Sequence, residues 1–197
     1  MSKRFSKAIL IAAVVCMLSV MLIVIASGNA SNDGSKINQL IQMSKAGKSV
    51  DEIIETAREN GFVISTSIDE VPVLSNSEIW DNFIADCNAG ISGSVKIARL
   101  WGYTYEERNV AIDNVVFENG KYSHTRYELV TGKAGKVYEY GPYSKLVGVK
   151  DEEHNVMEYI FTDRDDIDTH EDYMHIIIRG TTDELYSVKL FMFYSCE

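Results

Sequence analysis

Positive charge is scarce in this sequence. Its 197 residues include 19 lysines and arginines against 29 acidic residues, which gives a formal net charge of −10 at pH 7. The imbalance is larger beyond residue 30, because three of the basic residues and none of the acids precede that point. Polyanions bind proteins largely through lysine and arginine, so the composition argues against nucleic acid as a partner.

Cysteine is also scarce, with three residues in the chain. Cys16 lies within an apolar run, so Cys87 and Cys196 are the only thiols that an exported chain would place in an oxidising compartment. Sequence spacing cannot show whether these two come within bonding distance. Two interpretations therefore stay open, a Cys87–Cys196 disulfide or a buried Cys87 thiol with a separate Cys196 thiol near the terminus.

Catalytic motifs are missing. His170 and His175 are five residues apart, whereas a zinc-protease helix needs histidines four apart so that both face one metal ion. The stretch Gly132–Lys136 lacks the spacing of a phosphate-binding P-loop. No residue is marked as a nucleophile, because triads are recognised by geometry and not by order in the sequence. The sequence therefore favours a non-enzymatic protein, and we expect no cofactor.

One long hydrophobic run is present, at the N-terminus. Lys3, Arg4 and Lys7 precede an apolar segment over residues 8–26, which as a helix would reach about 28 Å, close to the thickness of a bilayer core. No acid occurs before Asp33, so the basic flank predicts a cytoplasmic N-terminus. We expect a single-pass protein of the cell membrane that contacts the bilayer through residues 8–26 and has its C-terminal domain outside.

A secreted protein is the alternative for this segment. Gly28 and Ala30 are small residues at the positions that a signal peptidase prefers for a cut before Ser31, although the apolar run is long for a signal peptide. Residues 1–30 are therefore predicted to be either a signal anchor or a signal peptide.

Residues 31–74 are predicted to form a spacer and a helical hairpin. Ser49 is a suitable N-cap for the second helix, and Asn60-Gly61 is a suitable end. We expect Phe62–Ser67 to be extended and Val71–Ser75 to be a linker. The helical spacing is carried by Ile37, Leu40, Ile41, Val50, Ile53, Ile54 and Ala57.

A third helix is predicted to open the domain that occupies residues 75–197. Ser75 or Ser77 is the expected cap of this helix. One apolar face of the helix would cover the sheet that follows, and it consists of Ile79, Trp80, Phe83, Ile84 and Cys87.

The periodicity changes to two beyond Ser94, which predicts strands. Asn119-Gly120 supplies the positive φ angles of a tight hairpin turn. The expected fold class is α+β, an N-terminal transmembrane or signal helix and short helices followed by a mainly antiparallel β-meander packed on a helix. The predicted strands are Val95–Tyr103, Val110–Phe117, Tyr122–Leu129, Val137–Val149, Val156–Thr162, Tyr173–Arg179 and Leu185–Tyr194.

This arrangement resembles a family of small exported or membrane-anchored proteins of unknown function from Gram-positive bacteria, in which antiparallel hairpins follow a helix. The resemblance rests on the helix at Ile79–Ile84, the strand at Ser94–Arg99, the turn at Phe117–Tyr122 and the terminal Cys196. It implies a fold and an extracytoplasmic location. It implies no activity, because the family has none assigned.

Two groups of residues are candidates for binding. The first is an acidic loop that contains Asp163, Asp165, Asp166 and Asp168. Its carboxylates are hard oxygen ligands for calcium, but the spacing fails the EF-hand pattern, because Asp168 stands where glycine is required. A solvated turn is the other interpretation of this loop. An aromatic surface for a protein, peptide or glycan could be formed by Trp101, Tyr138, Tyr140 and Tyr143, and cross-strand pairing within the sheet is its alternative explanation.

The sequence therefore predicts a membrane-anchored or secreted module of the bacterial cell envelope that binds a protein, a peptide or an envelope component. An envelope hydrolase is one alternative, and it would need a cleft that gathers His124, His154, His170 or His175 with acids. A regulatory or sensing protein that uses the helical hairpin near the membrane is another.

Overall fold

The structure, a computed structural model, describes residues 34–68, 73–102, 108–181 and 188–195. The chain divides into two compact units, Met1–Gln39 and Leu40–Glu197. Within the described ranges no helix is long and apolar enough to cross a membrane, and the predicted span at residues 8–26 lies outside them. The predicted boundary at residue 75 falls inside the second unit, which contains the helices α2–α4 and the strands β1–β9.

Two helices precede the first strand, as the apolar spacing predicts. Residues 34–45 are helical and α2 spans Val50–Glu59. Ser49 begins α2 with a capping box: its hydroxyl accepts from the Glu52 backbone nitrogen at 3.3 Å, and its own backbone nitrogen donates to the Glu52 carboxylate at 2.9 Å. The predicted Ser49 cap is therefore confirmed.

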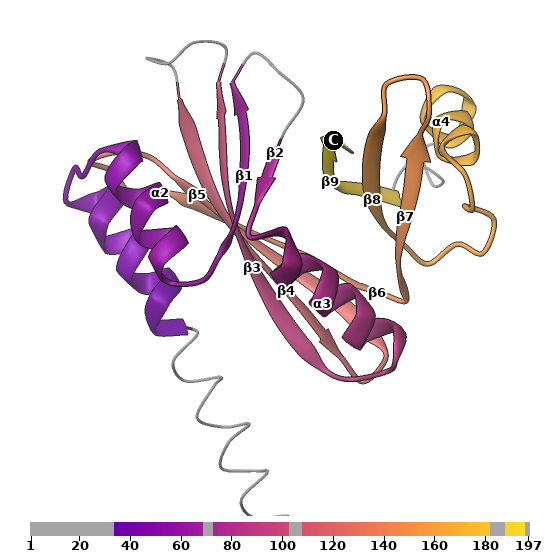
Figure 1. Cartoon of the computed structure of the whole chain (residues 1–197), viewed down its shortest axis with the longest axis horizontal. Coiled ribbons are helices and arrows are strands. Elements are labelled where there is room, and N and C mark those ends of the chain that lie inside the picture. The colour runs from indigo at the N-terminus through magenta and orange to yellow at the C-terminus, as the bar shows by residue number, and fades with distance from the viewer. Residues whose placement is uncertain (1–33, 69–72, 103–107, 182–187, 196–197) are drawn as a thin grey trace, which may run out of the picture. The chain divides into compact units, whose positions relative to one another are not determined.

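A six-stranded sheet, termed the first sheet, forms the centre of the second unit (Figure 1). Its strand order is β2-β1-β3-β4-β5-β6, and all neighbours are antiparallel except β1 and β3. The predicted linker at Val71–Ser75 is wrong in its described part, because β2 pairs with β1 and forms the edge of the sheet. The strands are β1 (Val63–Ile68), β2 (Val73–Ser75), β3 (Gly93–Gly102), β4 (Asn109–Glu118), β5 (Lys121–Leu129) and β6 (Lys136–Tyr143).

The turn between β4 and β5 determines the register of these two strands. Asn119 and Gly120 have φ angles of 53° and 72°, which confirms the predicted two-residue turn. Glu118 then pairs with Lys121, and the ladder continues back to Val110 and Leu129.

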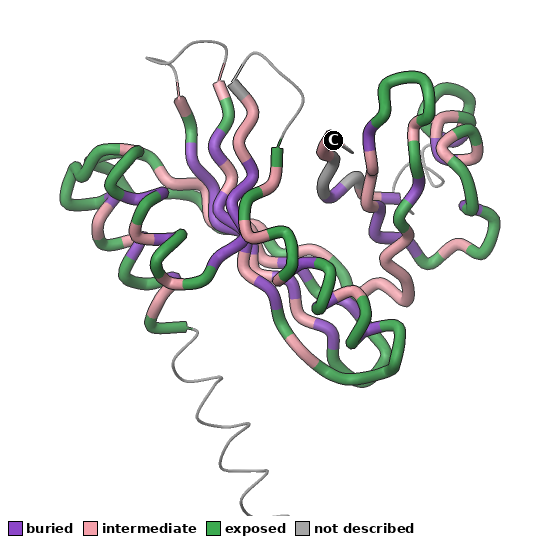
Figure 2. Tube along the Cα trace, viewed as in Figure 1, coloured by how far each residue is buried: buried purple, intermediate pink, exposed green. Residues whose placement is uncertain are grey.

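Helices cover both faces of the first sheet. On one face α2 contacts β1 and β3, above the buried side chains of Ile64, Ala98, Leu100, Val110 and Ile112. On the other face α3 (Ser77–Asn88) buries Trp80, Phe83 and Cys87 in a cluster with Val95, Ile97, Val115 and Phe117. Figure 2 shows that buried positions recur along the strands of the first sheet. The expected serine cap is wrong, because Asn76 is the N-cap and makes no side-chain capping bond.

A second, three-stranded sheet follows, in place of a continuation of the same meander. The prediction of one strand over Val137–Val149 is wrong, because the chain leaves β6 and enters β7 at Ser144, whose backbone nitrogen donates to Asp163 at 2.7 Å. Phe161 and Phe191 of the second sheet join the cluster beneath α3. The antiparallel strands of the second sheet are β7 (Lys145–Asp151), β8 (Val156–Thr162) and β9 (Val188–Ser195).

The predicted strand over Tyr173–Arg179 is also wrong, because α4 spans His170–Arg179. A capping box formed by Thr169 and Asp172 begins this helix. Tyr173 and Ile176, three residues apart, are buried on one side of it, in a cluster with residues of the second sheet. Helical spacing and a good cap therefore outweighed the β-branched residues of this segment.

Candidate functional site

A buried carboxylate lies at the centre of the first sheet. Alternation along β4 puts Asp113 on the face that carries Val115, and the register pairs it with Ile97 on β3 and Arg126 on β5. The Asp113 side chain is 0% exposed. An isolated buried carboxylate is strongly unfavourable, so its neighbours decide whether it can remain ionised.

Three nitrogen-bearing side chains surround Asp113. Arg126 donates from Nε at 2.8 Å and from Nη2 at 3.3 Å, and His124 Nε2 lies 2.6 Å from Oδ1. Arg99 donates from Nε to Oδ2, and its Nη2 donates to the Phe191 carbonyl of β9 at 2.7 Å. Both carboxylate oxygens are therefore engaged, and one arginine also ties the first sheet to the second.

The charges of this group are coupled. Burial by itself raises the pKa of Asp113, but the Arg99 charge and the hydrogen bonds from His124 and Arg126 outweigh it, so the pKa lies well below its usual range. Burial lowers the pKa of Arg99, and the nearby Arg126 charge lowers it further against the pull of Asp113. Asp113 is therefore ionised and is shared between two arginines.

His124 is enclosed by aromatic rings. Its ring is stacked on Tyr140 with centroids 5.1 Å apart, and it meets the edge of Phe191 at 4.8 Å. Burial lowers the pKa of His124, more than the bond to Asp113 raises it, so we assign the neutral ring with Nε2–H donating to the carboxylate. The Nδ1 atom is buried and has no hydrogen-bond partner among the described residues.

A third cation, Lys189 of β9, lies beside this group. Its Nζ is 4.6 Å from the centre of the Tyr140 ring, within the range of a cation–π contact. Burial and the positive charge of Arg126 both lower the pKa of Lys189. We use the name cationic face for Arg99, Arg126 and Lys189 with the adjoining tyrosines Tyr138 and Tyr140.

Two of the four aromatic residues predicted to bind a ligand belong to this face. Tyr138 and Tyr140 stack with centroids 6.5 Å apart, which confirms that they share one side of the sheet. Tyr143 instead stacks on Phe161 at 5.4 Å and packs against the core beneath α3. Trp101 is 38% exposed at the end of β3, and no ring contact joins it to the tyrosines in the part of the chain that the structure describes.

The charged residues of the face were missed at the sequence level, although a signal for them exists. The Asn119-Gly120 turn pairs Glu118 with Lys121, and counting five residues outward on each side reaches Asp113 and Arg126. Two positions nearer the turn, the same register places His124 opposite Val115. An acid among apolar residues of a predicted strand, opposite an arginine across a predicted turn, therefore indicates a buried ion pair.

The other histidines do not join His124. His154 Nδ1 lies 2.7 Å from Asp151, and His170 Nδ1 lies 2.7 Å from Glu158, both beside the second sheet. His175 is exposed on α4. His154 and His170 both lie beside Asp151, at 2.7 and 3.8 Å, whereas His124 is buried in the first sheet, so the four histidines are not gathered at one point.

The acidic loop engages cations of the chain itself. Asp163 accepts from the Ser144 backbone, Asp165 pairs with Lys145, and Asp166 accepts from Arg164 Nε at 2.7 Å. Across the described ranges, no three side chains among His, Cys, Asp and Glu are arranged to hold a metal ion. The carboxylates of the candidate calcium loop, including the exposed Asp168, are therefore not gathered around one point.

Of the two cysteines that could form a disulfide, the structure describes Cys87. Cys87 is buried on α3 and forms no disulfide with another described residue; burial raises the pKa of its thiol, and Tyr122 is its side-chain hydrogen-bonding partner. Cys196 lies outside the described residues, so the disulfide stays a prediction.

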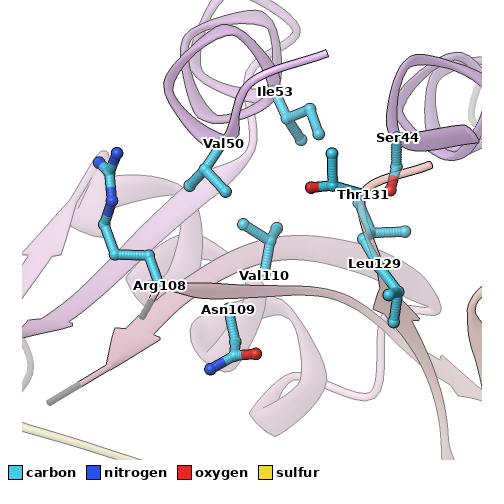
Figure 3. Close-up of a pocket in the computed structure, with 9 residues that line it drawn as sticks. Ser44, Val50, Ile53, Arg108, Asn109, Val110, Leu129 and Thr131 are labelled. Carbon is cyan, nitrogen blue, oxygen red and sulfur yellow. The ribbon is translucent and has the colours of Figure 1, made fainter. Parts of the chain in front are cut away.

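A second candidate site is a pocket of about 230 Å³ beside the N-terminal helices (Figure 3). Val50, Ile53 and Val110 converge at its centre in Figure 3. Arg108 lies at its edge and makes a two-pronged ion pair with Asp51, at 2.6 and 3.2 Å. Its main cation is thus already neutralised, which favours the cationic face as the site for a charged ligand. The remaining lining residues are Ser44, Asn109, Leu129, Val130 and Thr131.

No family model, no curated protein and no solved structure matches the chain. The function is therefore argued from the geometry and charge of the cationic face.

Proposed function

We propose that this protein is an extracytoplasmic binding module of the bacterial cell envelope, and that it contacts its ligand through the cationic face of the first sheet. The module is tethered to the membrane by residues 8–26, or released when the chain is cut before Ser31. Its partner is a protein, a peptide or another envelope component.

One observation carries this proposal: a half-buried group of cations and tyrosines lies on the sheet of a strongly acidic chain. The Arg126 side chain keeps 25% of its surface exposed, and Tyr138 and Tyr140 are half-buried, so a ligand can reach them. Tyrosine and arginine are the residues that most often dominate binding energy at interfaces, because they offer large contact areas and several hydrogen bonds.

The location rests on the sequence. The basic flank and the apolar run over residues 8–26 support export, and so does the resemblance to small exported proteins of Gram-positive bacteria. Intact mass spectrometry of membrane, medium and cytosolic fractions tests this part. A full-length membrane species or a secreted chain beginning at Ser31 is expected, whereas a full-length cytosolic protein would contradict export.

An envelope hydrolase is the second candidate, and it depends on the His124–Asp113 pair. Histidine held by a carboxylate is the usual arrangement of a catalytic base. In this structure Nδ1 of His124 is buried among aromatic rings, so it has no access to a substrate. Binding is therefore the better supported function of the same residues.

Capture of envelope components by the full-length protein in neutral detergent tests the binding function. Wild type, Tyr138→Ala and the matched control Tyr127→Ala are immobilised and exposed to solubilised envelope and cytosolic fractions. Tyr127 is the right control because it lies on the opposite face of the sheet, where it pairs with Ile112 and Val137. We expect Tyr138→Ala to reduce selective envelope capture by about fivefold, the effect of losing roughly 1 kcal/mol at an interface. Equal capture by both variants, or no selective capture by wild type, would refute the proposed surface.

A further inference from the structure

The cationic face carries more positive than negative charge. Arg99, Arg126 and Lys189 supply three cations, whereas Asp113 is the one carboxylate that accepts hydrogen bonds from them among the described residues. Glu128 is close enough to Arg126 to raise the pKa of that arginine, and its carboxylate accepts a hydrogen bond from Tyr138 at 3.4 Å. The face therefore keeps uncompensated positive charge in a chain whose net charge is −10.

The donors of the two arginines are largely directed inward. Arg126 uses Nε and Nη2 on Asp113, while Arg99 uses Nε on Asp113 and Nη2 on the Phe191 carbonyl. Lys189 differs from both, because in the described part of the chain its ammonium group makes no ion pair and rests against the Tyr140 ring. Its three N–H donors are therefore not engaged by a carboxylate of the described residues.

The surroundings strengthen this charge. The Tyr140 ring and the nearby Phe191 exclude water from one side of the cations, and charges interact more strongly where water is excluded. The cations also repel one another, since Arg126 lowers the pKa of both Arg99 and Lys189. An anion bound beside Lys189 and Arg126 would relieve that repulsion.

We propose that Lys189 and Arg126, beside Tyr140, form a site for one oxyanion group of the ligand, a carboxylate or a phosphate. The inference rests on the proposed binding function and names the chemistry that the face recognises. Lys189 is the principal donor, because the hydrogen bonds to Asp113 come from Arg99, His124 and Arg126 and none comes from Lys189. Arg126 contributes its field and its unshared Nη1. Tyr138 and Tyr140 hold the part of the ligand next to the anion.

Relaxation of the ³¹P signal of inorganic phosphate, measured with the full-length protein in neutral detergent, tests this site. Ionic strength is held constant with sodium chloride, so that general screening is the same in every sample. Wild type is compared with Lys189→Gln and with the matched control Lys133→Gln, which removes the same charge from an exposed loop residue. We expect Lys189→Gln to weaken phosphate binding about tenfold, as for the loss of one charge-assisted hydrogen bond, and Lys133→Gln to leave it unchanged.

Competition by acetate, measured in the same samples, distinguishes a carboxylate site from a phosphate site. Displacement of phosphate by acetate indicates a site for either group, and failure to displace it indicates a phosphate site; both outcomes support the proposal. Absence of saturable phosphate broadening together with absence of acetate binding overturns it, and so does equal binding by the Lys189→Gln and Lys133→Gln proteins. If Lys189→Gln does not fold, Lys189→Arg must retain binding and the wild-type titration still decides.

The result is separable from the test of the binding function. If the full-length protein captures an envelope component through Tyr138 but binds neither phosphate nor acetate, the module stands and the oxyanion site fails. If phosphate binds and no envelope component is captured, the site stands and the proposed function fails.

Discussion

Two histidine–aspartate pairs of nearly equal length lie in the two sheets of this protein. His124 Nε2 is 2.6 Å from Asp113 in the first sheet, and His154 Nδ1 is 2.7 Å from Asp151 at the turn after β7. The side chains of the first pair are 1% and 0% exposed, whereas those of the second are 67% and 14% exposed. The pKa of His124 is lowered, mainly by burial, and the pKa of His154 is raised, mainly by its hydrogen bond to Asp151.

The contrast shows that the distance between a histidine and an aspartate does not by itself determine whether the histidine is protonated. In water the attraction between the partners decides, and protonated histidine is favoured beside a carboxylate. In the sheet interior the cost of desolvating a third cation decides, because Asp113 already has Arg99 and Arg126 as partners. The first pair therefore organises a site, and the second is a local feature of a turn.

The largest expected effect comes from removing the buried carboxylate. Asp113→Asn leaves Arg99 and Arg126 without their shared counter-charge, so we expect a loss of about 3–5 kcal/mol in the free energy of unfolding, as for one partner of a buried ion pair. Asp151→Asn is the control, with a much smaller effect because its histidine is solvated. Urea unfolding of the full-length protein in detergent measures both variants. Similar losses for the two would show that the first pair is not buried in solution.

A smaller effect is expected for the coupling between residues of the site. Arg99→Met and Asp113→Asn should together destabilise the protein less than the sum of the two single changes, with a coupling of about 0.5–3 kcal/mol. The reason is that either single change already strands the other partner. The matched cycle on His154→Gln and Asp151→Asn should show a much smaller coupling, because His154 is largely exposed to solvent. Additivity in both cycles would contradict the direct contact between Arg99 and Asp113.

Features that depend on neighbouring residues could be predicted from the sequence, and features that depend on distant segments could not. Helix caps and tight turns depend on neighbouring residues, and for that reason Ser49 and Asn119-Gly120 were predicted correctly. The break at Ser144 was missed because it depends on a bond to Asp163 in a distant segment. The helix α4 was missed because its β-branched residues suggested a strand, although Thr169 could have been recognised in the sequence as an N-cap.

The site divides in the same way. Tyr138 and Tyr140 were found because alternation along one strand is a local pattern. Arg126 and His124 could have been placed opposite β4 by counting from the turn. Lys189 and the Phe191 carbonyl could not be placed in the site from the sequence. They belong to the second sheet, and no local sequence pattern predicts how that sheet packs against the first.

The smallest expected effect is on the titration of the two histidines, where the signs are opposite. His124, with its pKa below 6.5, stays neutral in the fold while the unfolded chain takes up a proton, so it lowers stability as the pH falls below about 6.5. Arg126 and Arg99 oppose its protonation, and Asp113 favours it.

His154, with its pKa above 6.5, adds stability that is fully present below about pH 6.5 and is lost as the pH rises through its folded value. Proton NMR of the imidazole signals, assigned with His154→Gln, measures both values in the full-length protein. We expect His154 to take up its proton first on acidification, and Asp151→Asn to return its pKa toward 6.5 without moving that of His124. If His124 protonates first, the desolvation that sets the two pairs apart is absent, and with it the physical basis for a neutral His124 beside the cationic face.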